Sequence, residues 1–321
     1  MSGVGRTTAA SGAYAPVAAR LAAALLIILF AAPFAGCVDQ HPKGTASGDE
    51  PASGTDAGGP RIVATSMATV EIMDRLGAEL IGVPHSDLSD PPERYKDVPE
   101  IGMPMSPDIE RIKSMKPDYV FSPSSLEPDL KPKYEAAGLN HWFLDLKSVD
   151  GMYASIETLG DMLGKEAEAT ALAEEYRAFL SEYQASHGGR AQPRVLVLMG
   201  LPGSYIVATD YSYVGSLVKM AGGLNVYADE TEEFIAANTE DMLGRDPDVI
   251  VRAAHALPDD VVEMFAEEFA ENDIWRHFRA VEAGRVYDLP YKEFGMSATF
   301  LYPDALKTLD GFLYADEEGA S

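Results

Sequence analysis

The sequence predicts an α/β protein with two lobes, joined by a single long helix, that binds its ligand in the cleft between the lobes. Short apolar runs alternate with amphipathic segments from Pro60 onward, a wholly helical stretch interrupts this alternation over 149–186, and one segment occurs twice. Strands that alternate with helices pair in parallel through crossover connections. Parallel sheets bind ligands at the carboxyl ends of their strands, so the ligand is expected there.

Residues 1–36 are predicted to be a lipoprotein signal peptide. Arg6 and Arg20 precede an apolar run over 21–30, and small residues then lead to Cys37, the one cysteine of the chain. This order is typical of a secretory signal, and the run is too short for a transmembrane helix. Cys37 is therefore the expected lipidation site. The alternative is an ordinary cleaved signal followed by a chance cysteine.

The segment 37–59 is expected to be a flexible tether behind the lipid. It contains mainly Gly, Ser, Thr, Asp and Pro, with almost nothing to bury. The whole chain carries 25 basic and 51 acidic side chains, which gives a formal net charge of −26. Without a basic stripe, this charge argues against nucleic acid and against an anionic membrane surface as partners. Membrane attachment is thus predicted through the lipid anchor alone.

The N-terminal lobe is predicted over 60–164. Short apolar runs that are followed by turn or helix-cap residues indicate strands at 61–64, 80–83, 119–121 and 141–144. Ser66 is expected to cap a helix that ends at Gly77. Ser106 is expected to cap another helix, with Pro107 in its first turn and acidic residues near its positive end.

The connecting helix is predicted over 165–188, because apolar residues recur there at helical spacing. Its main stretch, 165–186, would be about 33 Å long, which is enough to pass from one lobe to the other. Strand–helix alternation resumes at Arg194. A C-terminal lobe is therefore predicted over 189–321, with a last helix near 302–313.

An internal repeat supports two related lobes. The segment 110–120 matches 240–250: each has a glutamate early in a helix, then Pro-Asp seven and eight residues later, then a buried strand. Proline ends the helix and aspartate turns the chain into the strand. The alternative is that this helix–strand join is common and occurs twice by chance.

Catalytic motifs are missing from the sequence. Gly200–Ser204 follows a strand but lacks the ending of a phosphate-binding loop, and there is no G-x-S-x-G, H-E-x-x-H or Rossmann glycine pattern. The six histidines do not have metal-ligand spacing. A binding function is therefore favoured over an enzyme.

Two residues stand out by their placement. His255 follows the strand over 248–254 at its carboxyl end, and Met105 precedes Ser106 in the other lobe. Neutral imidazole is a good iron ligand, and a thioether with an imidazole would form an axial pair for haem iron. The alternatives are a loop histidine bonded to backbone and a methionine that acts as a hydrophobic staple. The residues alone leave both alternatives open.

The chain resembles the haem-binding lipoproteins of iron-regulated surface determinant uptake systems, which are substrate-binding proteins of ABC importers. The resemblance extends from Arg61 to Tyr314. Its most specific blocks are RYKDVP (94–99), PMSPD (104–108), VLVLMGLPGSY (195–205), RAAHALPD (252–259) and FGMS (294–297). It implies the same two-lobed fold, one haem b per chain, and iron ligation by Met105 and His255. Met103 and His85 are further candidate ligands and rank below these two.

The resemblance also implies that the haem propionates contact backbone amides at Met67 and Ala68 and at Ser86 and Asp87. Helix N-termini offer unpaired N–H groups to anions, which suits this role. Asp87 departs from the family, which tends to have a neutral hydrogen-bonding residue there. A carboxylate beside a propionate would repel it, so Asp87 is expected to point away or to alter affinity.

In related importers an exposed glutamate on each lobe meets arginines of the permease, which implies that role for Glu110 and Glu240. The alternative is that each merely stabilises a helix start. The expected protein is a monomeric, non-enzymatic haem receptor, lipid-anchored at the extracellular face of the cell membrane. Its expected partners are haem, an ABC permease with its ATPase, and cell-surface haem donors. The alternatives are a siderophore or corrinoid receptor with the same fold, a haem-modifying enzyme, and a haem sensor.

Overall fold

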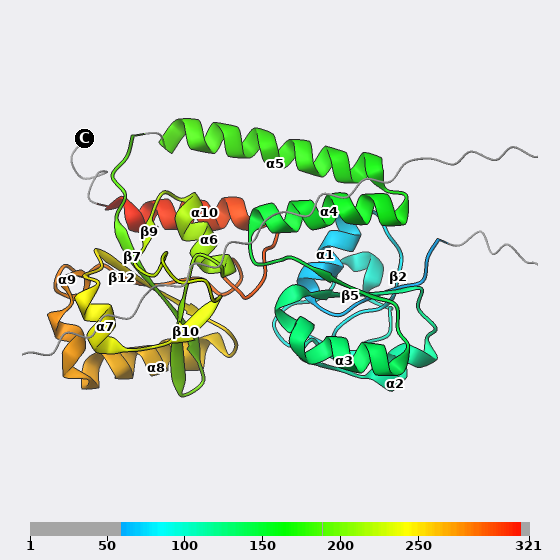
Figure 1. Cartoon of the computed structure of the whole chain (residues 1–321), viewed down its shortest axis with the longest axis horizontal. Helices are drawn as coiled ribbons and strands as arrows, with labels where there is room; N and C mark the ends of the chain where they lie inside the picture. Colours follow the sequence, from blue (N-terminus) through cyan, green and yellow to red (C-terminus); the bar gives the residue numbers. More distant parts are fainter. Residues whose placement is uncertain (1–58, 188, 316–321) are drawn as a thin grey trace, which may run out of the picture. The chain divides into compact units, whose positions relative to one another are not determined.

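The computed structural model of the chain describes residues 59–187 and 189–315. The predicted signal peptide, Cys37 and all but the last residue of the predicted tether lie outside this part. The described residues form two α/β lobes joined by the long helix α5 (Glu166–His187), as Figure 1 shows. The predicted fold class is thus confirmed. No helix among the described residues is long and apolar enough to cross a membrane.

The N-terminal lobe contains a four-stranded sheet in the order β2-β1-β5-β6, with every pair parallel. The parallel pairing predicted from strand–helix alternation is confirmed in this lobe. Its elements are β1 (Ile62–Ala64), α1 (Met67–Arg75), β2 (Leu80–Gly82), the 3-10 turn η1 (Glu93–Tyr95), β3 (Gly102–Met103), β4 (Ser106–Pro107), α2 (Ile109–Ser114), β5 (Tyr119–Pro123), η2 (Ser124–Leu126), α3 (Glu127–Ala137) and β6 (His141–Leu144).

Helix α1 has the predicted boundaries. The Ser66 hydroxyl accepts a hydrogen bond from the Thr69 amide at 3.2 Å, as an N-cap does. The helix ends at Arg75 with Leu76 as its C-cap, and Gly77 follows with φ of 64°, a left-handed conformation that glycine adopts without steric cost.

Helix α2 begins later than the sequence predicts. Its cap is Asp108, whose carboxylate accepts from the Arg111 amide at 2.9 Å. Ser106 lies instead in β4, which pairs antiparallel with β3 and places Ser106 opposite Met103. A carboxylate caps a helix as well as a hydroxyl does, and the extended backbone of the hairpin holds Ser106 outside the helix.

The C-terminal lobe contains a mixed six-stranded sheet in the order β10-β8-β7-β11-β12, with β9 beside β7. Strands β8 and β10 run antiparallel to their neighbours, which the sequence does not predict. Pro202 and Gly203 form a two-residue turn that returns the chain alongside β7. The elements are β7 (Arg194–Leu201), β8 (Ser204–Ala208), α6 (Tyr213–Met220), β9 (Leu224–Asn225), β10 (Phe234–Ala236), α7 (Thr239–Gly244), β11 (Val249–Ala254), α8 (Pro258–Glu271), η3 (Asp273–His277), α9 (Arg279–Glu282) and β12 (Val286–Asp288).

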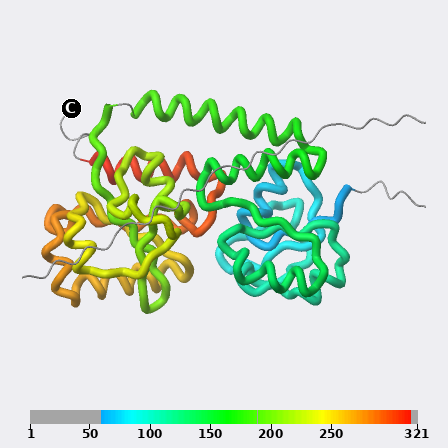
Figure 2. The backbone as a smooth tube through the Cα atoms, viewed as in Figure 1, coloured from blue at the N-terminus to red at the C-terminus, as the bar shows by residue number. Residues whose placement is uncertain are grey.

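Two further helices pack against α5, namely α4 (Val149–Leu163) and α10 (Tyr302–Leu313). Figures 1 and 2 show α5 running along both α4 and α10. The Tyr176 ring of α5 stacks on Tyr153 of α4 with centroids 4.3 Å apart, and Tyr183 of α5 donates to Asp310 of α10 at 2.8 Å. The predicted long helix is therefore held to both lobes along its length.

The first copy of the repeat forms a short connection between α2 and β5. After α2, Lys116 adopts φ of 51° and the chain turns toward the strand. The Asp118 carboxylate accepts from the Arg61 amide at 2.7 Å, and the Arg61 guanidinium donates to the Met115 carbonyl at 2.7 Å. These bonds fix β5 beside β1.

The second copy makes the same join between α7 and β11. Asp246 adopts φ of 47°, and the Asp248 carboxylate accepts from the Arg194 amide at 2.8 Å. The Arg194 guanidinium donates to the Arg245 carbonyl at 2.5 Å. Because the same turn and the same bonds occur in both lobes, the sequence repeat corresponds to a repeated structure.

Candidate ligand-binding site

Four of the predicted site residues lie at the carboxyl ends of two adjacent strands. Met67 and Ala68 open α1 directly after β1, and Ser86 and Asp87 follow β2. Because β1 and β2 pair in parallel, both strands end at the same edge of the sheet. This is the edge at which parallel α/β sheets bind ligands.

The first turn of α1 offers backbone donors at this edge. The Ser66 hydroxyl accepts the hydrogen bond that the Thr69 amide donates. Within the described part of the chain, the amides of Met67 and Ala68 donate to no acceptor. Such N–H groups lie at the positive end of the helix dipole, so they suit an anionic ligand group.

The loop after β2 contains a second pair of amides. The Ser86 hydroxyl accepts from the amides of Leu88 at 3.3 Å and Ser89 at 3.2 Å, which folds the loop back on itself. The amides of Ser86 and Asp87 have no acceptor among the residues that the structure describes. A cavity of about 340 Å³, lined in part by Ser86 and Lys96, lies under this loop.

Met105 lies at the tip of the β3–β4 hairpin, with 62% of the residue exposed. The hairpin is attached to the loop after β2, because the His85 amide donates to the Gly102 carbonyl at 2.9 Å. Met105 does not occupy the staple position of α2, since the residue before the Asp108 cap is Pro107. Its thioether is therefore accessible. Met103, on the same hairpin, is 46% exposed.

His255 lies in the C-terminal lobe, immediately after β11. Its backbone amide donates to the Gly200 carbonyl at 2.9 Å, but its buried Nδ1 atom has no hydrogen-bond partner within the described residues. Burial lowers the pKa of His255, so the neutral imidazole predominates at neutral pH. Among the described residues no side chain or carbonyl bonds the His255 ring, so the imidazole is not committed to a structural hydrogen bond.

Leu257, two residues beyond His255, is a feature that the sequence does not reveal. It adopts φ of 47°, a conformation that is rare for a bulky residue, and is 54% exposed. It stands at the N-cap of α8, where no side chain of the described residues caps the helix. The only signal in the sequence is the following Pro258, which restricts the backbone of the residue before it.

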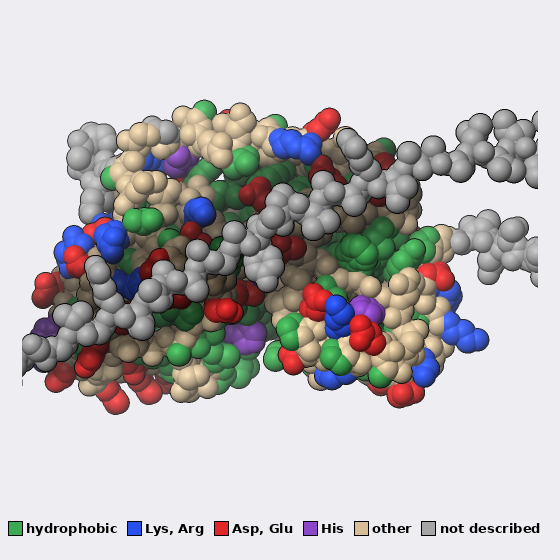
Figure 3. Space-filling view, viewed as in Figure 1, with side chains coloured by type: hydrophobic (Ala, Val, Ile, Leu, Met, Phe, Trp, Pro, Cys, Tyr) green, Lys and Arg blue, Asp and Glu red, His purple; other side chains and the backbone are tan. Residues whose placement is uncertain are grey.

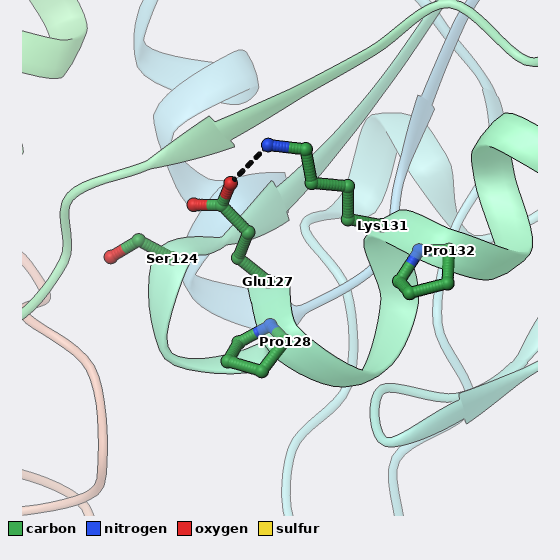
Figure 4. Close-up of a pocket in the computed structure, with 5 residues that line it drawn as sticks. All are labelled: Ser124, Glu127, Pro128, Lys131 and Pro132. Carbon is green, nitrogen blue, oxygen red and sulfur yellow. Dashed lines mark hydrogen bonds and ion pairs between the residues drawn. The ribbon is translucent and has the colours of Figure 1, made fainter.

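A second cavity, of about 370 Å³, lies at the start of α3 beyond the end of β5. Figure 4 shows its lining, in which Lys131 and Glu127 form an ion pair with a separation of 2.9 Å. The Ser124 hydroxyl on this lining is buried without a partner in the described part of the chain. None of the predicted site residues lines this cavity.

Glu110 and Glu240 occupy equivalent positions in the first turns of α2 and α7, and both are exposed. The Asp108 and Asn238 side chains cap these two helices.

Figure 3 shows acidic side chains gathered over α8, in keeping with the excess of acidic residues in the chain.

Comparison of the sequence with known proteins identifies the family of the chain. The family model for periplasmic binding proteins matches residues 62–293. The "High-affinity heme uptake system protein IsdE" of Staphylococcus aureus (strain Newman) is 40% identical over 265 residues, which span 82% of this chain and 90% of that protein.

Solved structures of related proteins are similar to this chain in both sequence and fold. An ABC transporter substrate-binding protein from Listeria monocytogenes EGD-e is 46% identical, with a TM-score of 0.76, over 80% of this chain and 99% of the other. Staphylococcus aureus IsdE complexed with heme is 41% identical, with a TM-score of 0.76, over 80% and 100% of the two chains. The vitamin B12 binding protein BtuF of Vibrio cholerae, at 19% identity and a TM-score of 0.64 over 81% and 98%, shares the fold.

These matches confirm the resemblance predicted from the sequence blocks: the chain is homologous to IsdE and to substrate-binding proteins of ABC transporters. They also agree with the two lobes and the long connecting helix. The chain therefore belongs to the periplasmic binding protein family.

Proposed function

We propose that this protein binds one haem b between its two lobes and delivers it to an ABC importer for iron acquisition. The observation that carries the proposal is the His255 imidazole, which is neutral, partly buried and without a side-chain partner among the described residues, at the end of a parallel strand. The relatives named above include a haem-uptake protein and its complex with haem, which supports the choice of cargo.

His255 and Met105 are the proposed axial ligands of the iron. Met105 offers an exposed thioether on the N-terminal lobe, and His255 offers a neutral imidazole on the C-terminal lobe. This pair would give six-coordinate iron, and the thioether would favour the ferrous state more than a second histidine would. Burial of the porphyrin against apolar groups would provide affinity, while the two ligands would fix its orientation.

The propionates are proposed to contact the amides of Met67 and Ala68 and those of Ser86 and Asp87. All four amides are available at one edge of the N-terminal sheet. A chain with a net charge of −26 can bind a dianion if local donors dominate, because charges beyond about 8 Å are screened at physiological salt.

The remaining assignments follow the same proposal. We divide the chain into a signal peptide (1–36), a tether lipidated at Cys37 (37–59), two lobes (60–164 and 189–321) and the connecting helix (165–188). The protein would be a monomer held by its lipid at the extracellular face of the cell membrane. It would receive haem from cell-surface donors and would not act as an enzyme.

An absorbance titration of the full-length protein in detergent with ferric haem tests the cargo and its ligands. We expect a saturable one-to-one low-spin spectrum. Met105→Ala and His255→Ala should each lose it or turn it high-spin, whereas the control Met103→Ala, on the same hairpin, should keep it. No saturable change in the wild type would refute haem as cargo and lead to siderophores and corrinoids. Progressive loss of the porphyrin absorbance would indicate a haem-modifying enzyme.

Glu110 and Glu240 are proposed to dock the two lobes on the permease. Their exposure and their equivalent positions in the repeat support this role. Reversing both charges (Glu110→Lys with Glu240→Lys) should leave the haem spectrum intact and abolish haem-dependent growth of the cells. Unchanged growth would show that the two residues only stabilise their helices.

A further inference from the structure

Asp87 poses an electrostatic problem at the loop after β2. Its amide is one of the proposed propionate donors, yet its own carboxylate would repel a propionate placed beside it. The side chain is 80% exposed, so solvent weakens but does not remove this repulsion. A nearby positive charge would be needed to offset it.

His85 is in position to supply that charge. Its Nε2 atom lies 3.2 Å from the Asp87 Oδ1 atom, and its Nδ1 atom lies 2.9 Å from the Glu100 Oε2 atom. Carboxylates only accept hydrogen bonds, so a ring that bonds both carboxylates must donate from both nitrogens. The arrangement therefore corresponds to an imidazolium.

The backbone fixes the ring in this place. The His85 amide donates to Gly102 at the base of the β3–β4 hairpin, so the residue joins the loop after β2 to the hairpin that carries Met105. The hydrogen bond to Glu100 is the largest cause that raises the pKa of His85, and Asp87 raises it further. The charged side chains that line the cavity under this loop are Glu100, Asp90 and Lys96.

We propose that His85 is a positioning residue for the anionic edge of the ligand: it draws the Asp87 carboxylate aside and offsets its charge, so that the Ser86 and Asp87 amides can donate hydrogen bonds to a carboxylate group of the ligand. This inference rests on the proposed haem function. It assigns to His85 a role on the propionates in place of the lower-ranked role as an iron ligand.

A double-mutant cycle on the full-length protein tests the inference, with haem affinity measured by absorbance titration. His85→Gln should weaken haem binding by about fivefold, because the amide side chain keeps a hydrogen bond but loses the charge. Asp87→Asn alone should tighten binding by about twofold. The double variant should return to within about twofold of the wild type, because the Asp87 carboxylate, whose amide is the proposed propionate donor, is then absent.

Two controls separate this role from others. Lys96→Gln removes a positive charge from the cavity that Ser86 and Glu100 line, and Lys96 forms no bond with Asp87 in the described part of the chain, so this change should weaken haem binding by less than about twofold. Haem dimethyl ester, whose carboxylates are uncharged, should bind all the variants with affinities within about twofold of one another. The low-spin spectrum should persist in His85→Gln.

Three results would overturn the inference: a double variant as weak as His85→Gln, an equal effect on the dimethyl ester, or a high-spin spectrum in His85→Gln. The last would make His85 an iron ligand. Failure of the wild type to bind haem at all would instead refute the proposed function, so the two failures are distinguishable.

Discussion

The two lobes make the same helix–strand join but stabilise the following strand in opposite ways. Ser122 and Arg252 are the fourth residues after Asp118 and Asp248, so they are equivalent in the repeat. Ser122 lies in a buried chain of hydroxyl groups, bonded to Thr65 at 2.8 Å and to Tyr134 at 3.0 Å.

Arg252, by contrast, forms a bidentate ion pair with Asp288 of β12, with distances of 2.8 and 2.6 Å. Its guanidinium also lies 4.9 Å from the centroid of the Phe269 ring. A repeated join therefore fixes where the strand begins, whereas the neighbouring strands and helices determine what its interior contains. At this position, β5 is held by neutral hydrogen bonds and β11 by an ion pair.

The ion pair of the C-terminal lobe should give the largest effect. Asp288→Ala should lower the free energy of unfolding by about 3 kcal/mol, because it leaves the Arg252 guanidinium, 11% exposed, without its partner. Urea denaturation monitored by circular dichroism measures this change. The matched control, Arg252→Met combined with Asp288→Leu, should lose less than about 1 kcal/mol. An equal loss in the double variant would show that packing, not charge, dominates.

The hydroxyl chain of the N-terminal lobe should give a smaller effect. Ser122→Ala should cost about 1.5 kcal/mol, because Thr65 and Tyr134 are fully buried and each loses a hydrogen-bond partner. The same urea titration tests this value. A cost as large as that of Asp288→Ala would remove the contrast between the two lobes.

The aspartates of the repeat sharpen the comparison further. Asp248 also pairs with Arg279 at 2.8 Å and is only 25% exposed, whereas Asp118 is exposed. Asp248→Ala should therefore cost about 1 kcal/mol and Asp118→Ala about half of that. Equal costs in urea denaturation would mean that Arg279 adds nothing to the second join.

The last prediction concerns the pH dependence of haem affinity. The pKa of His85 is raised from 6.5 by Glu100 and Asp87, so its positive charge is complete below that ordinary value and disappears as pH rises through the raised one. Haem affinity of the wild type should therefore fall by about fivefold between about pH 6 and pH 9. Titrations over this range should show a flatter profile for His85→Gln, and identical profiles would contradict the assignment.

Local signals made much of the fold predictable. The spacing of apolar residues gives the long helix, Ser66 and Gly77 delimit α1, and the Pro-Asp pairs locate both copies of the repeat. These features depend on neighbours in sequence, where propensity and capping act directly.

Features that depend on distant residues were not predictable. The antiparallel β8 follows from a Pro-Gly turn whose strands pair only in the folded sheet, and the Asp108 cap follows from a hairpin that holds Ser106 in extended backbone. The bond between His85 and Glu100 joins residues 15 apart in sequence. The position of His255 after a strand is readable from the chain, but the lack of a partner for its Nδ1 atom among the described residues is not.

The aromatic contacts between α4, α5 and α10 have a mechanical consequence. Tyr176 packs both face-on against Tyr153 and edge-on against Tyr302, and the Ala298 amide donates to the Leu146 carbonyl at 2.7 Å. A wide swing of one lobe would separate these rings and break this bond, so the connection acts as a strut and not as a hinge. Capture of a flat cargo would then need little closure and little ordering of the protein. Under the proposed function, release of the haem would then also have to proceed without a wide opening of the two lobes.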